Sequence, residues 1–284
     1  MTQKKLAELA GVSVATVSKA FSGSREIGEK TKAKIFDIAK KAGCFDTYYK
    51  SVRERPLVAL IFPEAESEYY GRQIDMLERA LAARGADTII GFTHFDRATE
   101  ARLFSELAYK MKVDGVIVSG ACEMISNSDE IPLVVLNEID TRGKNADKVT
   151  VEYSEGMAKL AKTLKELGHR TVGFFGEPLT IYKEAMLRRA LRREGLPIYD
   201  KYFLCSEYRF VNAGEDCMRR LLETNDLPDV IVGAYDEIAY GAMRVAREAG
   251  IKLPDTLSFV GINDVTATAY FDLPLSSLHV GYEL

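Results

Sequence analysis

The stretch Leu6–Gly23, LAELAGVSVATVSKAFSG, decides how the first part of the chain folds. Apolar residues recur at helical spacing up to Gly11, a residue that is well suited to end a helix. Ser13 is a good N-cap for a second helix, whose buried face contains Val17 and Phe21. Two short helices joined by a short turn that contains Gly are typical of a helix-turn-helix, whose second helix enters the major groove of DNA.

The residues that follow extend this pattern to a three-helix core. The segment 29–42 has apolar residues at helical spacing, and Gly43 lies at its end. Residues 1–55 hold 12 Lys and Arg against 6 Asp and Glu, a net charge of +6, whereas residues 56–284 hold 26 against 36, a net charge of −10; together they make the −4 of the chain. A basic segment of this kind is expected of a nucleic-acid-binding module, and we therefore predict a DNA-binding domain over residues 1–45.

From residue 57 onward, short apolar strand patterns alternate with amphipathic helix patterns. This alternation predicts an α/β fold with two doubly wound parallel sheets, one in each of two subdomains that face each other across a cleft. Ligands of such sheets bind at the carboxyl ends of the strands. Strands are expected at residues 57–62, 87–92, 113–119, 132–137, 148–152, 171–175, near 202, at 229–233 and at 257–262. Helices are expected at residues 71–84, 97–111, 154–167, 181–194, 213–224 and 237–249.

Composition and motif content exclude several classes of protein. The 284 residues are 47% apolar and 28% charged, as in ordinary globular proteins. Apolar runs such as Leu57–Phe62 are far shorter than the roughly 18 residues of a membrane helix, and no signal peptide is recognisable, so we expect a cytoplasmic protein. Four cysteines without CxxC spacing indicate free thiols. Nucleotide-binding, zinc-protease and serine-hydrolase motifs are missing, so we predict no catalytic residue, no metal and no cofactor.

Several longer motifs match a known family in order and spacing. In the head these are AGVS at 10–13, TVS at 16–18 and EKT at 29–31. Further along they are VDGVIVSG at 113–120, ELGHRTVGFFGEP at 166–178, YDEIAYGAMRVAREAGIKLPDTLSFVGIND at 235–264 and PLSSLHV at 274–280. With these motifs the chain resembles the lactose-repressor/galactose-repressor family of bacterial transcription regulators over nearly its whole length. The resemblance implies a helix-turn-helix head and a sensor region similar to periplasmic sugar-binding proteins.

The resemblance implies which residues of the head contact DNA. Val14, Ala15 and Lys19 occupy positions with which the family touches base edges. A lysine can donate to guanine O6 and N7, whereas Val and Ala can contact a thymine methyl group. Short hydroxyl side chains near helix ends are expected to contact phosphates, or equally to cap their own helices. These are Ser13, Thr16, Ser18, Ser22 and Thr31.

The predicted linker, residues 46–56, departs from the family pattern. The family has a short hinge helix whose leucine inserts into the minor groove. Here Lys50, Ser51 and Val52 form a partial match, with Val52 in place of the leucine and no proline at the start. A shorter side chain unstacks a base step less effectively, so an ordinary linker is an almost equal alternative.

The sensor domain is predicted over residues 57–284, with an effector-binding site at its strand ends. By resemblance, Asp236 holds effector hydroxyls, Lys183 replaces a family arginine, and Tyr69 and Tyr70 stack on the ligand. The family pattern has asparagine beside two acids; here Tyr235 precedes Asp236, and the pair is Glu152 with Tyr153. For each tyrosine, packing in the core with an exposed hydroxyl is an equal alternative, and for Asp236 the alternative is an N-cap of the next helix.

These features together predict a transcriptional repressor. Its partners are expected to be double-stranded, pseudo-palindromic operator DNA and a small effector, a sugar or related metabolite, with the chain acting as a homodimer. A small-ligand-binding protein without a regulatory role is the alternative, and a nucleotide-dependent enzyme is a remote third. In the family a further helix follows the PLSSL segment, and the sequence ends at Leu284 where that helix is expected to begin.

Overall fold

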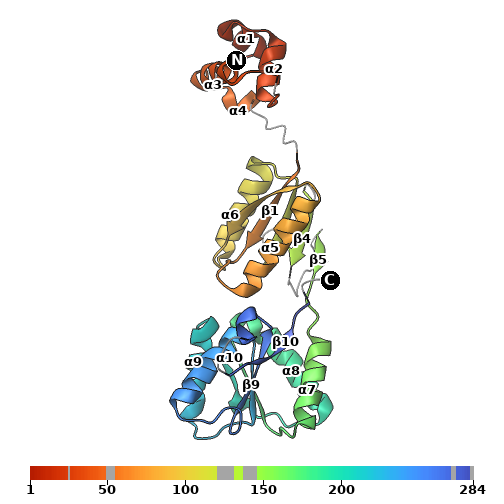
Figure 1. The fold of residues 1–284 in the computed structure, drawn as a ribbon, viewed down its shortest axis with the longest axis vertical. Coiled ribbons are helices and arrows are strands. Elements are labelled where there is room, and N and C mark those ends of the chain that lie inside the picture. The colour runs from red at the N-terminus through yellow and green to blue at the C-terminus, as the bar shows by residue number, and fades with distance from the viewer. Residues whose placement is uncertain (25, 49–54, 120–130, 137–145, 270–272, 282–284) are drawn as a thin grey trace. The chain divides into compact units, whose positions relative to one another are not determined.

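The structure, a computed structural model, describes residues 1–24, 26–48, 55–119, 131–136, 146–269 and 273–281 (Figure 1). Internal contacts divide the chain into two units, Met1–Val58 with Leu81–Thr88, and Ala59–Ala80 with Ile89–Leu284. We call residues 1–48 the head and residues 55–281 the body. The predicted hinge residues Lys50, Ser51 and Val52 lie outside the described residues. None of the described helices has the length and apolar character needed to cross a bilayer.

The head is the predicted helix-turn-helix with a third helix packed against it. Its helices are α1 (Gln3–Ala10), α2 (Val14–Phe21), α3 (Glu29–Lys41) and the short α4 (Phe45–Tyr48). Gly11 ends α1 with φ of 67°, and the Ser13 hydroxyl caps α2 by accepting from Thr16 N at 3.0 Å.

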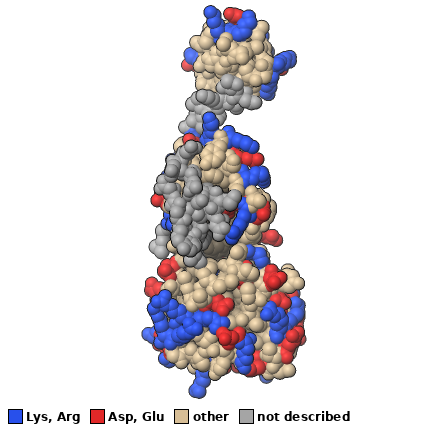
Figure 2. Space-filling model, turned by 180° about the vertical axis from the view of Figure 1, so that it is seen from behind, with Lys and Arg blue, Asp and Glu red and all other residues tan. Residues whose placement is uncertain are grey.

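Figure 2 shows Lys and Arg side chains standing out from the head, and acidic side chains scattered among basic ones over the body.

The head core is apolar at its centre and aromatic at one end. Leu6, Val17 and Ile35 are fully buried between the three helices. Phe21 lies 5.1 Å from Phe36 between ring centroids, and the rings of Phe45 and Tyr48 pack on it at 5.9 and 5.8 Å. Helix α4 thus packs on the aromatic end of the head core, although most of its residues were predicted to belong to the linker.

The first sheet of the body has the strand order β2-β1-β3-β4-β5. The pairs β3–β4 and β4–β5 are parallel. The strands are β1 (Leu57–Phe62), β2 (Asp87–Phe92), β3 (Gly115–Ser119), β4 (Leu133–Leu136) and β5 (Asp147–Val149). The helices are α5 (Glu68–Ala83) and α6 (Arg97–Ser105), which continues as a π-helical turn, Glu106–Lys110.

The second sheet has the strand order β10-β9-β8-β6-β7, with parallel pairing throughout. Its strands are β6 (Val172–Gly176), β7 (Phe203–Cys205), β8 (Val230–Gly233), β9 (Ser258–Asn263) and β10 (Ser276–His279). Its helices are α7 (Ser154–Glu166), α8 (Ile181–Glu194), α9 (Phe210–Leu222) and α10 (Asp236–Glu248), with 3-10 turns at Pro178–Thr180, Asp200–Tyr202 and Thr266–Ala269. The predicted α/β fold with two parallel sheets is confirmed.

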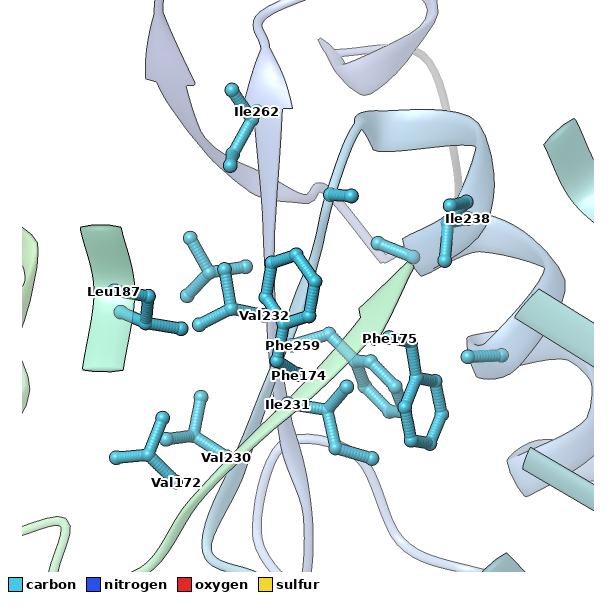
Figure 3. Close-up of a cluster of buried hydrophobic side chains, with 14 of the residues drawn as sticks. Val172, Phe174, Phe175, Leu187, Val230, Ile231, Val232, Ile238, Phe259 and Ile262 are labelled. Carbon is cyan, nitrogen blue, oxygen red and sulfur yellow. The ribbon is translucent and has the colours of Figure 1, made fainter. Parts of the chain in front are cut away.

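The core of the second sheet joins its strands to the helices that cover it (Figure 3). Phe174, Ile231 and Phe259 come from three strands, and Leu187 of α8 and Ile238 of α10 pack on them. Replacing one such buried side chain by Ala typically costs about 2–5 kcal/mol. This rigid layer fixes the strand ends that surround the site described below.

Two glycines bring α9 and α10 into backbone contact. A Cβ on Gly214 would lie 1.9 Å from the carbonyl oxygen of Ile238, and a Cβ on Gly241 would lie 2.0 Å from that of Val211. Only glycine leaves room for this approach. The close contact holds the N-terminal turn of α10, which carries predicted site residues, against α9.

Candidate functional site

The outward face of α2 is a stripe of exposed side chains. Val17, Ala20 and Phe21 are buried on its inner face. We call the exposed set the reading stripe; it consists of Val14, Ala15, Ser18, Lys19 and Ser22. Small side chains at the start of the stripe leave the helix backbone free to approach a groove, and Lys19 is its long hydrogen-bond donor. All five residues were predicted to contact DNA.

Three of the five predicted phosphate-contacting hydroxyls, those of Ser13, Thr16 and Ser22, have partners within the head. Ser13 caps α2, and its Oγ lies 2.8 Å from the Thr16 hydroxyl. Ser22 donates from its hydroxyl to the Lys19 carbonyl at 3.1 Å. Thr31 lies half-buried in the first turn of α3. Capping, the alternative given for Ser13, is therefore what its hydroxyl does in the free head.

A cavity of about 330 Å³ lies at the carboxyl ends of the strands in the body. Ser119 ends β3, Asn263 ends β9, and Glu177 directly follows β6. This is the edge at which ligands of doubly wound sheets bind. The lining consists of Pro63, Ser67, Tyr69, Tyr70, Thr93, Phe95, Asp96, Arg97, Glu100, Ser119, Glu177, Leu179, Thr180, Tyr182, Lys183, Arg209, Phe210, Tyr235, Glu237 and Asn263.

Aromatic rings cover much of the cavity wall. Tyr70 packs edge-on against Tyr69 at 5.0 Å and against Phe95 at 6.2 Å between centroids. Phe210 lies 5.8 Å from Tyr235, whose hydroxyl accepts from Phe210 N at 3.0 Å. Burial raises the pKa of the Tyr70 and Tyr235 hydroxyls, so both stay protonated. Flat apolar faces edged with hydroxyls suit ligands that have both an apolar and a polar side.

Two cationic side chains of the wall, Lys183 and Arg209, are held in place by neighbours. Lys183 is 4% exposed, donates from Nζ to the Ala234 carbonyl at 2.9 Å and lies 4.7 Å from the Tyr153 ring centre. Burial lowers the pKa of Lys183 to about 8. Arg209 stacks on Phe95 at 3.8 Å and lies 3.7 Å from the buried carboxylate of Glu177. Both cations are therefore oriented before a ligand arrives.

Two buried polar atoms of the wall have no hydrogen-bond partner among the described residues. These are Oδ1 of Asn263, an acceptor, and Nε of Arg209, a donor. Asn263 is 4% exposed and ends β9 with φ of 103°, a conformation that side chains rarely adopt. Unpaired buried polar groups are costly, so this pair is poised for a ligand that both donates and accepts. Neither residue was predicted to lie in the site. Asn263 could have been found from the sequence, because it directly follows the strand predicted at residues 257–262.

Four of the seven predicted effector-binding residues line the cavity: Tyr69, Tyr70, Lys183 and Tyr235. Tyr153 lies behind the wall, where its hydroxyl interacts with that of Tyr69 and its ring lies beside Lys183. Glu152 is exposed and accepts from Ser154 N at 2.6 Å at the start of α7. Tyr153 thus supports the wall, and Glu152 caps a helix.

Asp236, predicted to hold the effector, is not among the residues that line the cavity. Its carboxylate is completely buried and accepts from Val265 N at 2.8 Å and from the Ser277 hydroxyl at 2.5 Å. A Cβ on Gly261 would lie 1.9 Å from Asp236 Oδ1, so the glycine makes room for it. Burial raises the pKa of Asp236 to about 7. In the structure Asp236 joins α10 to β10 and to the loop after β9, and its neighbour Glu237 lines the cavity instead.

Groups of three or more His, Cys, Asp or Glu arranged to hold a metal ion do not occur among the described residues. His94 and His169 belong to different loops, and His279 of β10 pairs through Nδ1 with Asp264 at 2.9 Å. The cavity wall offers a ligand aromatic faces and oriented charges.

The chain matches two protein families. Residues 2–44 match the family described as bacterial regulatory proteins, lacI family, and residues 161–284 match the periplasmic binding protein-like domain. The HTH-type transcriptional regulator DegA of Bacillus subtilis is 26% identical over 96% of this chain and 84% of its own length. The HTH-type transcriptional repressor PurR of Yersinia pestis (strain Pestoides F) is 25% identical over 98% and 85%.

Solved structures share the fold. The transcriptional regulator CelR in complex with cellobiose has a TM-score of 0.70 and 23% identity, covering 98% of this chain and 87% of that one. The lac repressor dimer bound to operator and an anti-inducer has a TM-score of 0.72 and 18% identity, covering 98% and 86%. With a lacI-type match over residues 2–44, a periplasmic-binding-protein-like match over residues 161–284 and regulators as relatives over nearly its full length, the chain is similar throughout to bacterial regulatory proteins of the lacI family.

Proposed function

We propose that this chain is a one-component transcriptional repressor without catalytic activity that works in the cytoplasm. Its head binds a pseudo-palindromic operator as part of a homodimer, and a small effector in the cavity controls the operator affinity. The observation that carries the proposal is that one chain combines the exposed reading stripe with a cavity in which Asn263 Oδ1 and Arg209 Nε have no hydrogen-bond partner in the described part of the chain. A DNA-binding element and a ligand site in one chain are the minimum for such a regulator.

We propose a hydroxyl-bearing small molecule, a sugar or related metabolite, as the effector. One hydroxyl group can donate to Asn263 Oδ1, and another can accept from Arg209 Nε. The aromatic rings of Tyr70, Phe95 and Tyr235 offer flat surfaces to the apolar face of a sugar ring. The complex of CelR with cellobiose, a protein of the same fold, supports this ligand class.

The effector can control DNA binding if it binds one arrangement of the two sheets more tightly than another. The cavity wall takes residues from both sheets, Ser119 from the first and Asn263 from the second. A ligand that fits one arrangement of the sheets better than another increases the population of that arrangement. The resulting coupling to the operator is typically about 1–3 kcal/mol, which corresponds to a roughly 5- to 150-fold change in affinity.

The test begins with the full-length protein and two screens. Selection from a random duplex library gives a binding site, and thermal-shift measurements with sugars, sugar phosphates and nucleosides give a ligand that raises the Tm. The ligand is expected to change the Kd for the selected duplex at least fivefold. A ligand that stabilises the protein but leaves DNA affinity unchanged would contradict the proposed coupling.

A variant links that effect to the cavity. Asn263→Gly removes the amide at a φ of 103° that glycine adopts easily, and Asn225→Gly is the matched control, exposed and with φ of 51°. Asn263→Gly is expected to weaken ligand binding about three- to tenfold, the usual worth of one hydrogen bond, with DNA binding unchanged. Equal effects of the two variants on ligand affinity would place the ligand elsewhere.

A further inference from the structure

The loop between α2 and α3 places an acid on the DNA-facing side of the head. Glu26 forms an ion pair through its carboxylate with Nζ of Lys19, the long donor of the reading stripe. Both side chains are exposed, 49% for Lys19 and 68% for Glu26. The ammonium group and the carboxylate are thus presented together at the end of the stripe, as one donor next to one acceptor.

An acid at this place is unfavourable for general DNA binding. Affinity for DNA of any sequence comes from cations that neutralise phosphates, and a carboxylate beside Lys19 reduces that attraction. The ion pair is exposed, and such pairs contribute little to the stability of a fold. Neither non-specific affinity nor stability therefore accounts for Glu26, whereas a contact with a base edge does.

The chemistry of a G·C pair matches this arrangement. In the major groove, a G·C pair shows the acceptors N7 and O6 of guanine next to the amino donor N4 of cytosine. O6 and N4 are hydrogen-bonded to each other, about 2.9 Å apart. A donor that contacts O6 and an acceptor that contacts N4 must therefore be neighbours themselves, as the charged groups of Lys19 and Glu26 are.

We propose that Glu26 is a specificity-determining residue that reads a single G·C pair together with Lys19. Lys19 donates to guanine O6 and N7, and Glu26 accepts from the amino group of the paired cytosine. A lysine alone tolerates any base that offers an acceptor, since adenine N7 and thymine O4 also accept. Glu26 adds a requirement for an amino donor on the other strand, which cytosine supplies opposite guanine and thymine does not supply opposite adenine. A T·A pair also places an acceptor, O4, beside a donor, adenine N6, but it lacks the second acceptor that guanine N7 gives to Lys19. This inference rests on the proposed operator binding.

The test compares the full-length protein with two alanine variants. Glu26→Ala removes the acceptor, and Glu8→Ala is the control, an exposed acid of α1 that pairs with Lys5 at 3.0 Å and makes the same change in charge away from the reading stripe. Each protein is used to select sites from a random duplex library. Binding titrations then measure Kd for the wild-type site and for the same site with its G·C pair changed to A·T.

The wild-type protein and Glu8→Ala are expected to select the same site, with one G·C pair required in each half-site. Glu26→Ala is expected to lose that requirement, to keep the rest of the site, and to bind the original duplex about tenfold more weakly. The proposal is overturned if Glu26→Ala selects the same site as the wild type, or binds every duplex more tightly. A wild-type protein that selects no sequence would instead refute operator binding itself.

Discussion

Lys19 is the long donor among the three residues predicted to touch bases, and the structure leaves it exposed on α2. Replacing it with Ala is expected to cost about 1–3 kcal/mol on the selected operator, because a donor to guanine is lost. Binding to random DNA is expected to change little. Titrations with both duplexes decide the outcome: equal losses on the two would show that Lys19 contacts phosphate.

Asp236 gives the body a pH-dependent stability. Its pKa in the folded state is about 7, well above the usual value of about 4, so the folded state holds this proton more tightly than the unfolded chain does. The stability that the protonated carboxyl contributes is complete below pH 4 and is lost as the pH rises through 7. Asn imitates the protonated form at every pH.

The variant Asp236→Asn is therefore expected to gain stability relative to the wild type as the pH rises. The difference in Tm between the two should be more positive at pH 8 than at pH 5. Asp75→Asn, on the exposed surface of α5, is the control and should show no such trend. Loss of effector affinity in Asp236→Asn at unchanged stability would instead support the original assignment of Asp236 to the ligand.

The site was partly predictable because apolar patterns in the sequence show where the strands end, and ligands of such sheets bind at strand ends. Tyr235 follows β8 closely, whereas Tyr69 and Tyr70 lie in the first turn of α5 and were assigned by resemblance; all three line the cavity. Asp236 also lies at a strand end, but its direction depends on Gly261 of the neighbouring strand, which leaves the space that it fills. Arg209 reaches the cavity from the loop before α9 by stacking on Phe95. Contacts between residues so far apart in the chain leave no recognisable pattern in the local sequence.

At the scale of elements, the contact between α9 and α10 is the tightest constraint. Gly241→Ala would place a methyl group 2.0 Å from the Val211 carbonyl oxygen, so the helices must separate. Alanine favours a helix by itself, but the overlap outweighs that gain, and we expect a loss of at least about 2 kcal/mol in the free energy of unfolding. Urea denaturation measures it.

Gly71→Ala in α5 is the matched control for this change. A Cβ there would meet the Ala65 carbonyl oxygen at 3.5 Å, an ordinary contact, and its φ is not positive. It is expected to be neutral or stabilising by up to about 1 kcal/mol. Similar destabilisation in both variants would mean that α9 and α10 can move apart at little cost.

Most elements were predictable because their ends carry capping residues. The helix Gln3–Ala10 ends at Gly11, and Ile181–Glu194 ends at Gly195, which has φ of 73°. Several elements differ from the prediction. Helix α5 begins at Glu68 rather than at residue 71, and α9 begins at Phe210 rather than at residue 213. The segment 97–111 changes to a π-helical turn after Ser105, and α4 forms because its aromatic side chains find Phe21. The packing of α4 on Phe21 joins residues distant in the sequence, which a local pattern does not reveal.

At the scale of the whole molecule, a basic head and an acidic body divide the work. Phosphate contacts by head lysines should give operator binding a log–log salt slope of roughly −0.9 per neutralised phosphate. Lys30, exposed in the first turn of α3, is a candidate. Lys30→Ala is expected to weaken binding to all duplexes alike and to reduce the slope by about 1. A change confined to one sequence would contradict a phosphate contact.

The acidic body should bind no DNA by itself. A fragment that begins at Arg55 keeps the hydrogen bond from Arg55 to the Gly85 carbonyl, 2.9 Å, and the ion pair with Asp87, 3.0 Å. It is expected to keep its ligand and to lose all measurable affinity for the selected duplex. Affinity retained in this fragment would refute the division of work.

The tyrosines of the cavity also make the fluorescence of the protein sensitive to a bound ligand. The chain has 14 tyrosines and no tryptophan, so its ultraviolet emission comes from tyrosine without transfer to an indole acceptor. Four of these emitters, Tyr69, Tyr70, Tyr182 and Tyr235, border the cavity. A molecule that enters the cavity replaces the solvent around their rings. The intrinsic tyrosine fluorescence of the unlabelled protein is therefore expected to change when the cavity is occupied.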